Sequence, residues 1–311
     1  MTLKVSFAGA VACIALTSVV QAADMQPVLK APAAVDQQAT GYVEVYSGWA
    51  STRSENFGVS DRFNGWALGG AGRGNYWVSR DMSVQVDVQA EGTSYSASIG
   101  HASTHSYLVG GHWSWRNPQQ YLFGVFGGVG DAGGAGVTEG TSERHGLIGA
   151  EAQWYWRQFT LYVQGGYDTM LGNAFAVDTI NAWFIRGTGR YFINPNFLIE
   201  GTVMYANGNV DFGSNSGDPF SVGFQTWTWG VKGEWRFATV PFSVFAKYQG
   251  SETKYDNVSS FRDAKVTDSR VLLGLKLHMG DRTLQQTDRA GATLDIVSPL
   301  ANPSSPLIFA P

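Results

Sequence analysis

The stretch of sequence that decides the fold reads Gln225-Thr226-Trp227-Thr228-Trp229-Gly230-Val231-Lys232-Gly233-Glu234-Trp235-Arg236-Phe237. From Trp227 onward, every odd-numbered position except Gly233 carries a large apolar side chain, and the even-numbered positions carry Thr, Gly or a charged residue. A period of two indicates a β-strand with one apolar face and one polar face. A helical period would scatter the charged residues of this stretch around the helix, so the stretch predicts a strand.

The same alternation recurs in residues 83–91, 196–206 and 269–279, where charged residues never fall on the apolar face. Short turn signals flanked by aromatic residues recur at intervals of roughly 40 residues, which is a period typical of repeated structural units. These turns lie at Ser79-Arg80-Asp81, Asn117-Pro118-Gln119, Arg157-Gln158, Asn194-Pro195-Asn196 and Thr239-Val240-Pro241. The alternation and the turns together predict a long series of antiparallel strands.

Longer polar and Gly-rich segments separate the turns, at about 51–64, 97–104, 131–144, 169–181, 207–224 and 252–268. Short turns on one side, long loops on the other and aromatic girdles between them are typical of bacterial outer-membrane barrels. Five turns and six loops predict an all-β fold, a transmembrane up-and-down antiparallel β-barrel of about 12 strands. An even number of strands places both termini on the periplasmic side.

The competing architecture is a soluble β-sandwich or lipid-binding barrel. A soluble protein would turn these apolar faces inward, and so many Trp and Tyr side chains would require a very large core. In lipid, by contrast, the wall must close, because every backbone N–H and C=O group needs a partner. Clustering of the aromatic residues beside the short turns favours lipid.

The first residues have the pattern of a cleaved export signal. Lys4 precedes an apolar run over residues 5–20, and cleavage is expected after Ala22. A membrane anchor is the alternative. The predicted organisation is a signal peptide at 1–22, a periplasmic lead at 23–40, the barrel at 41–279 and a periplasmic tail at 280–311. Cys13 is the only cysteine, so the mature chain would lack cysteine catalysis and thiolate metal sites.

Loss of Lys4 leaves 20 of the 21 Lys and Arg residues against 25 acidic ones, a net charge of −5. This balance argues against nucleic acid as a partner. After the signal, no apolar stretch is long enough for a transmembrane helix. The expected partners are outer-membrane lipid and lipopolysaccharide, the barrel-assembly machinery and small solutes, and the oligomeric state is left open.

The mature N-terminus reads Ala23-Asp24-Met25-Gln26-Pro27-Val28-Leu29-Lys30-Ala31-Pro32. It resembles the lead of alphaproteobacterial outer-membrane porin-family proteins, in which a signal ending in Ala precedes an Ala-Asp-(Leu/Met)-Pro-x-Lys-Ala-Pro-like segment. The resemblance covers the signal and the lead closely and implies a Gram-negative outer membrane. The predicted last strand ends near Met279 and a polar tail follows, whereas small members of that group end at a terminal aromatic residue.

Alternation assigns charged side chains of both signs to the lumen, and twelve strands lie between filled eight-stranded barrels and open sixteen-stranded porins. A narrow channel for small hydrophilic solutes follows, with a weak preference for anions because basic residues predominate. The alternative is a lumen plugged by salt bridges, as Arg186 and Arg190 could form with Glu200 and Glu234. The predicted pore-lining residues are Arg73, Asp87, Glu91, Arg116, Glu151, Arg186, Arg190, Glu200, Lys232, Glu234, Arg236, Lys247, Arg270 and Lys276.

Two other classes of function remain. One is a structural or adhesive surface protein, for which the charged loop 252–268 is the candidate contact. The other is an outer-membrane hydrolase, although the sequence has no Gly-x-Ser-x-Gly elbow and Ser/His pairs such as Ser103 and His105 carry little weight. No cofactor, catalytic or metal-binding residue is predicted. His101 and His105 would converge on a metal only in a helix, and Asp211 and Asp218 lack the ligand spacing of a Ca²⁺ loop.

Overall fold

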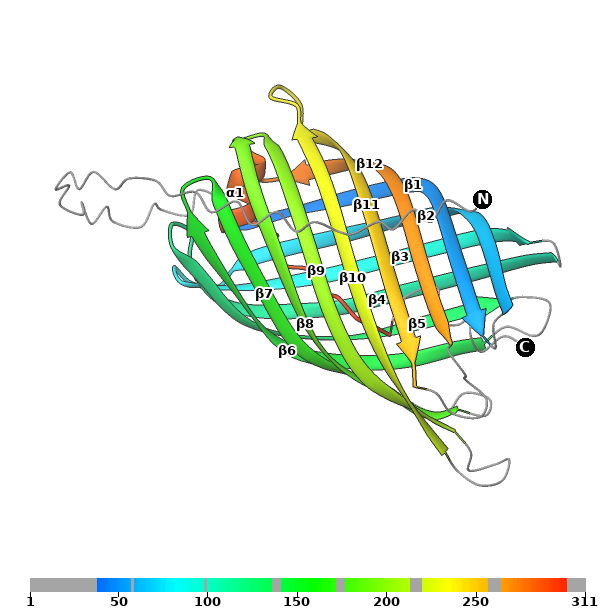
Figure 1. Ribbon diagram of the computed structural model, residues 1–311. Helices are drawn as coiled ribbons and strands as arrows, with labels where there is room; N and C mark the ends of the chain where they lie inside the picture. The colour runs from blue at the N-terminus through cyan, green and yellow to red at the C-terminus, as the bar shows by residue number, and fades with distance from the viewer. Residues whose placement is uncertain are drawn as a thin grey trace, which may run out of the picture. The chain divides into compact units, whose positions relative to one another are not determined.

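The structure is a computed structural model that describes residues 38–56, 59–97, 100–135, 141–171, 177–212, 220–256 and 264–300. It is a closed barrel in which each strand pairs antiparallel with its neighbours in sequence, as predicted (Figure 1). The elements are β1 (Ala39–Asn56), β2 (Val59–Trp77), β3 (Met82–Ala97), β4 (Gly100–Asn117), β5 (Tyr121–Ala135), β6 (Thr141–Trp156), β7 (Phe159–Met170), β8 (Val177–Asn194), β9 (Phe197–Phe212), β10 (Phe220–Arg236), β11 (Phe242–Tyr255), β12 (Lys265–Met279) and α1 (Leu284–Ala290).

Pairing of the first strand with the last closes the wall. β1 and β12 run antiparallel in register from Gly41 opposite Met279 to Glu55 opposite Lys265. This pairing leaves no free sheet edge, which is the condition for a sheet to cross hydrocarbon. Within the described residues, no helix has the length and apolar content needed to cross a bilayer.

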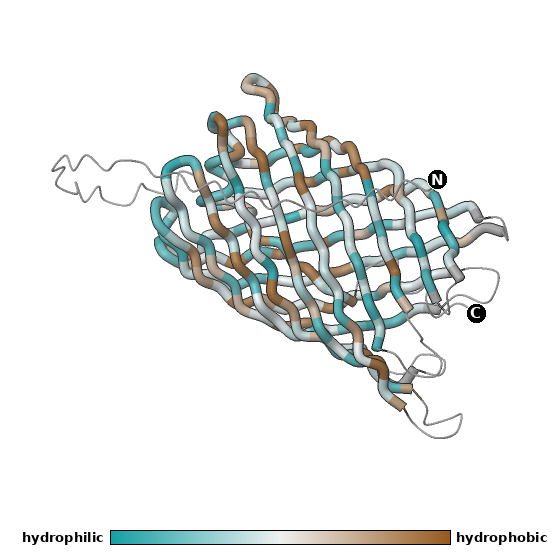
Figure 2. Tube along the Cα trace, viewed as in Figure 1, coloured by the Kyte–Doolittle hydropathy of each residue, from teal (hydrophilic) through white to brown (hydrophobic). Residues whose placement is uncertain are grey.

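The period of two seen in the sequence separates two environments. Leu275 on β12 is 54% exposed on the outer face, while the next residue, Lys276, is 5% exposed and faces the lumen. Trp227, Trp229 and Trp235 of β10 likewise lie on the outer surface. Hydrophobic and hydrophilic residues alternate along the strands in Figure 2. An apolar exterior around a polar interior inverts the arrangement of a soluble barrel and suits a lipid environment.

The five short turns form as predicted, but the strands run further toward the opposite end than expected. β1 continues to Asn56 and β2 begins at Val59, although the sequence indicated a loop over 51–64. About 9–11 residues suffice for a strand to cross a bilayer, and β2 has 19 residues. The polar ends of the strands still pair in the sheet because backbone pairing does not depend on an apolar face.

The chain after β12 lies inside the barrel, which corrects the prediction of a free periplasmic tail for residues 280–300. Helix α1 covers the end of the barrel with the short turns, where the backbone N–H of Gln285 donates to the Pro195 carbonyl. Leu284 packs there against Phe192 and Leu198. The segment then runs along the lumen until Leu300 packs near the long-loop end. Residues 301–311, like the predicted signal and most of the lead, lie outside the described residues.

Candidate functional site

The lumen is the candidate site, and it contains all of the charged side chains that the alternation assigned to it. Most are buried, and Arg73, Glu91, Glu200, Lys232 and Lys247 are partly exposed to the interior. They do not form a uniform lining. Some contact the C-terminal segment, whereas others surround a cavity beside it.

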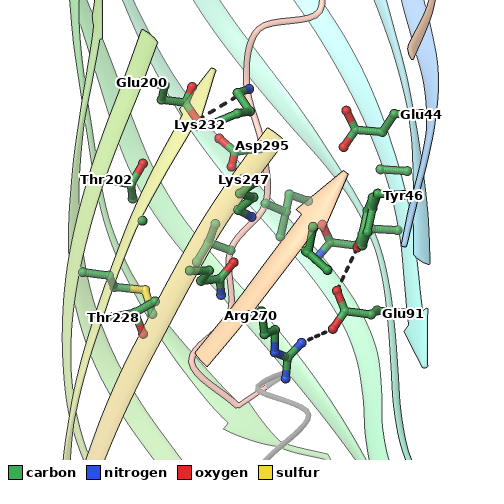
Figure 3. Close-up of a pocket in the computed structure, with 18 of the residues that line it drawn as sticks. Glu44, Tyr46, Glu91, Glu200, Thr202, Thr228, Lys232, Lys247, Arg270 and Asp295 are labelled. Carbon is green, nitrogen blue, oxygen red and sulfur yellow. Dashed lines mark hydrogen bonds and ion pairs between the residues drawn. The ribbon is translucent and has the colours of Figure 1, made fainter. Parts of the chain in front are cut away.

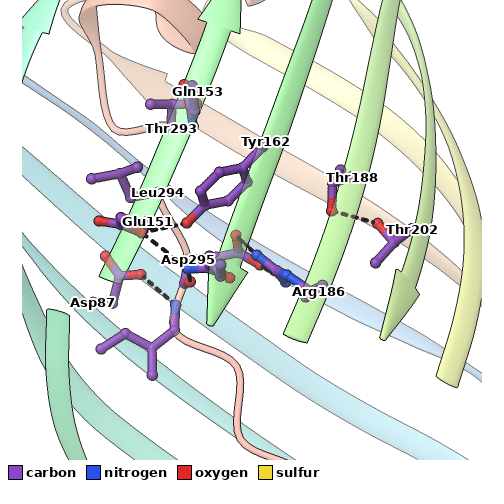
Figure 4. Close-up of polar contacts among 12 residues, drawn as sticks. Asp87, Glu151, Gln153, Tyr162, Arg186, Thr188, Thr202, Thr293, Leu294 and Asp295 are labelled. Carbon is purple, nitrogen blue, oxygen red and sulfur yellow. Dashed lines mark hydrogen bonds and ion pairs between the residues drawn. The ribbon is translucent and has the colours of Figure 1, made fainter. Parts of the chain in front are cut away.

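The C-terminal segment, residues 281–300, is held first through its backbone. The Gln85 side chain forms two bonds with Leu294: its Nε2 donates to the carbonyl at 2.7 Å and its Oε1 accepts from the backbone N–H at 3.2 Å. Gln164 Nε2 donates to the Asp295 carbonyl at 2.8 Å, and the Ile296 N–H donates to Asp87 at 3.3 Å (Figure 4). An extended segment normally needs a neighbouring strand to pair its backbone N–H and C=O groups. Here polar side chains of the wall supply these hydrogen bonds instead.

Two arginines of β8 hold the segment by charge. Arg186 donates through both terminal nitrogens to the Asp295 carboxylate, at 2.6 and 2.5 Å. Arg190 binds Asp288 at 2.8 Å and also pairs with Glu200 at 2.8 Å. A buried bidentate pair such as that of Arg186 with Asp295 is strong and directional.

Apolar contacts reinforce the ionic ones. Leu294 packs with Leu122, Tyr155 and Tyr162, and Ile296 packs in a cluster with Leu108 and Phe126. Two glycines of the wall also face Ile296. A Cβ at Gly110 would collide with Ile296 Cδ1, and one at Gly128 would lie 3.3 Å from it. The segment can lie against β4 and β5 because these two positions lack side chains.

Helix α1 and the residues before it close the short-turn end. Thr283 caps the helix by accepting a hydrogen bond from the Gln286 N–H at 3.1 Å. The Trp77 indole points inward and donates to the Ala290 carbonyl at 2.8 Å, and Arg116 donates to the Gly291 carbonyl at 2.9 Å. Burial raises the pKa of Asp281 to about 6, despite the opposing influence of Thr287 and Arg236.

A cavity of about 270 Å³ remains beside the segment, toward β8–β12 and β1–β3 (Figure 3). Residues 295–299 form one side of it. Its wall combines basic and acidic groups with hydroxyl, amide and aromatic side chains. The charged members are Arg73, Arg186, Arg190, Lys232, Lys247, Arg270 and Lys276 against Glu44, Glu91, Glu200 and Asp295.

The carboxylates that line the cavity already have cationic partners. Glu44 binds Lys276 at 3.2 Å, Glu200 binds Arg190, and Asp295 binds Arg186. Glu91 binds Arg270 and also accepts a hydrogen bond from the Tyr46 hydroxyl. Four more acids, Asp87, Glu234, Asp268 and Asp288, pair with the basic residues from behind the cavity surface.

Of the ion pairs that the sequence suggested for a plugged lumen, one is present in the structure and the other is not. Arg190 pairs with Glu200 as considered, but Arg186 pairs with Asp295 of the C-terminal segment. Alternation within strands could not reveal Asp288 or Asp295, because neither lies on a strand. The signals that could have found them are the Thr283-x-x-Gln286 capping pattern and the alternation of Leu294 and Ile296 with Thr293 and Asp295.

Two of the chain's five histidines, His145 and His105, contact acidic side chains of the barrel. His145 Nδ1 meets both Asp168, at 3.0 Å, and Ser298, at 3.3 Å, whereas a catalytic triad places the acid and the nucleophile on opposite ring nitrogens. This cluster thus tethers the C-terminal segment. His105 lies 3.5 Å from Asp131. The side chain of His101 and the whole of Asp218 fall outside the described parts of the chain, and the parts that are described contain no group of metal-ligating side chains.

Comparison with known proteins supports the architecture. The chain is similar to an outer membrane channel from Pseudomonas putida F1, with a TM-score of 0.55 and 12% identity over 78% of this chain and 96% of that one. It is also similar to the translocator domain of the autotransporter NalP from Neisseria meningitidis, with a TM-score of 0.50 and 9% identity over 78% and 89%. No protein-family model and no curated protein sequence matches the chain. The likeness shows a fold used by Gram-negative outer-membrane barrels.

Proposed function

We propose that this protein is an outer-membrane channel for small hydrophilic solutes, with a weak preference for anions, whose bore is narrowed by its own C-terminal segment. The observation that carries the proposal is the cavity beside that segment, with its polar and charged wall. A barrel with only a structural role would be more stable with a lumen filled by packed side chains. This barrel instead contains a polar cavity in its lumen.

The choice of a channel for hydrophilic solutes rests on the chemistry of the lining. Hydroxyl and amide groups such as Thr202, Thr228 and Gln249 can replace the water molecules of a passing solute. Lys247 faces the cavity and has no acidic partner among the described residues, which supports the preference for anions. The channel named for the Pseudomonas putida neighbour supports conduction as one use of this architecture.

Planar bilayers containing the full-length protein test this proposal. Stepwise conductance is expected in KCl, with a reversal potential that indicates modest selectivity for chloride. Lys247→Glu should shift the reversal potential toward cations, because Lys247 faces the cavity. Lys254→Glu is the matched control, since Lys254 lies on the same strand but is exposed at its long-loop end. A wild-type reversal potential that showed no chloride selectivity would refute the anion preference, and an unchanged value in Lys247→Glu would show that Lys247 does not set it.

A structural barrel with a plugged lumen is the second candidate. The specific observation in its favour is that the C-terminal segment runs from α1 at the short-turn end to Leu300 near the long-loop end, with buried anchors along its length. Folded protein that inserts into bilayers without producing conductance steps, at any voltage tried, would favour this structural role over transport.

A further inference from the structure

One basic side chain on the cavity wall differs from the rest. Lys247 on β11 faces the cavity (Figure 3). It forms no ion pair or hydrogen bond with any residue of the described chain. Lys232, directly opposite it on β10, lies 3.5 Å from both Glu200 and Glu234. Like charges directly opposite each other across two strands destabilise the sheet. Here the two carboxylates offset the charge of Lys232, while that of Lys247 is left without a partner among the residues described.

The neighbours of Lys247 extend it into a polar patch. Gln249 follows two residues later on the same face of β11, and Thr228 faces the cavity from β10. Neither side chain forms a hydrogen bond within the described residues, so donors and acceptors remain free on both. Gly230 lies opposite Gln249, between Thr228 and Lys232 along β10. Because Gly230 has no side chain, the patch has a recess in the wall at its centre.

We propose that Lys247, Thr228 and Gln249 form a binding site for a small polyhydroxylated monocarboxylate, with Lys247 binding the carboxylate and the other two binding hydroxyl groups. The proposal deepens the proposed function, since it names a class of solute that the channel would take up. An anion beside Lys247 supplies the direct ion-pair partner that no side chain of the described residues provides. A buried or half-buried charge without a partner is costly, so this gain favours binding.

The charge and size of the ligand follow from the surroundings. Within the described part of the chain only one lining cation lacks a partner, so the second charge of a dianion would find no free cation on the cavity wall. A monoanion matches the single free charge. The volume of about 270 Å³ lies just below the usual range for small-molecule pockets. It suits a molecule of the size of one sugar unit.

Calorimetric titration of the folded full-length protein in detergent micelles tests the site, with sodium gluconate as the probe. Gluconate is expected to bind, and Lys247→Gln should weaken binding by about tenfold or more, the usual effect of losing a hydrogen bond to a charged group. Lys247→Arg should retain binding because it keeps the charge, and Lys254→Gln should leave it unchanged. Glucose, which has similar size without the carboxylate, should bind much more weakly.

Several outcomes would overturn the site: no heat of gluconate binding to folded protein, equal binding of glucose, or an unchanged affinity in folded Lys247→Gln protein. Sulfate that bound as tightly as gluconate would overturn the assignment to a monoanion. Conductance measured in parallel separates the two proposals. Conduction of KCl without gluconate binding would remove the site and keep the channel, whereas binding without conductance would keep the site and remove the channel.

Discussion

Replacement of Asp295 by asparagine should release the C-terminal segment from the wall while the barrel stays folded. Arg186 and Asp295 form a bidentate pair with side chains that are 7% and 20% exposed. Breaking a buried pair by removing one partner costs about 3–5 kcal/mol. The exposure of Asp295 to the cavity places the cost near the lower limit, about 3 kcal/mol. Since 1.4 kcal/mol is a factor of ten, the docking equilibrium should weaken by roughly a hundredfold.

Cysteine labelling measures this release. Cys13 is the only cysteine of the chain, so a Cys13→Ser, Ile296→Cys background carries one thiol, at a position that is buried when the segment is docked. Adding Asp295→Asn should raise the rate of labelling by a water-soluble maleimide at neutral pH by up to a hundredfold. The exposed Asp61 offers the control Asp61→Asn. A labelling rate within about twofold of the background, in folded protein, would refute the idea that this pair holds the segment.

Three further predictions address the other contacts. Leu275→Arg should destabilise the barrel in lipid vesicles by about 2–4 kcal/mol, because it places a charge on the lipid face; equal urea midpoints for the variant and the wild type would contradict that orientation. In a Cys13→Ser, Leu294→Cys background, which keeps Ile296 and carries its thiol at a buried position, Gly110→Val should speed labelling of the introduced thiol, because a side chain at position 110 would collide with Ile296 Cδ1. Gly111→Val, on the opposite face, should not, and equal rates would show that Gly110 does not seat the segment. Burial raises the pKa of Asp281 to about 6, from an ordinary value of 3.8. The folded state therefore binds the Asp281 proton more tightly than the unfolded state does. The contribution of this proton to stability is complete below pH 3.8 and is lost as the pH rises through about 6. Asp281→Asn should thus stabilise the protein by roughly 2–3 kcal/mol at pH 8 and have little effect near pH 4, and equal stabilisation in urea at both pH values would disprove the assignment.

Local pattern was sufficient to predict the barrel. In 225–237 the side of the wall on which each residue lies follows from parity alone, because successive side chains of a strand point to opposite faces. The short turns set the strand count, and closure followed from the requirement that backbone groups be paired in lipid. The predicted lumen residues face inward for the same reason.

Contacts between distant parts of the chain were decided only by the tertiary structure. Arg186 and Lys247 both read as inward-facing basic residues, yet Arg186 binds Asp295, 109 residues later, and Lys247 is left without a partner in the described chain. Parity determines a face but carries no information about what occupies the space in front of it. The C-terminal segment has no lipid face and no strand partner. Neither the alternation of faces nor the pairing of backbone groups in lipid could therefore predict its path. Its path depends on glycines at 110 and 128 and on amide and arginine side chains from several strands, which only closure of the barrel brings together.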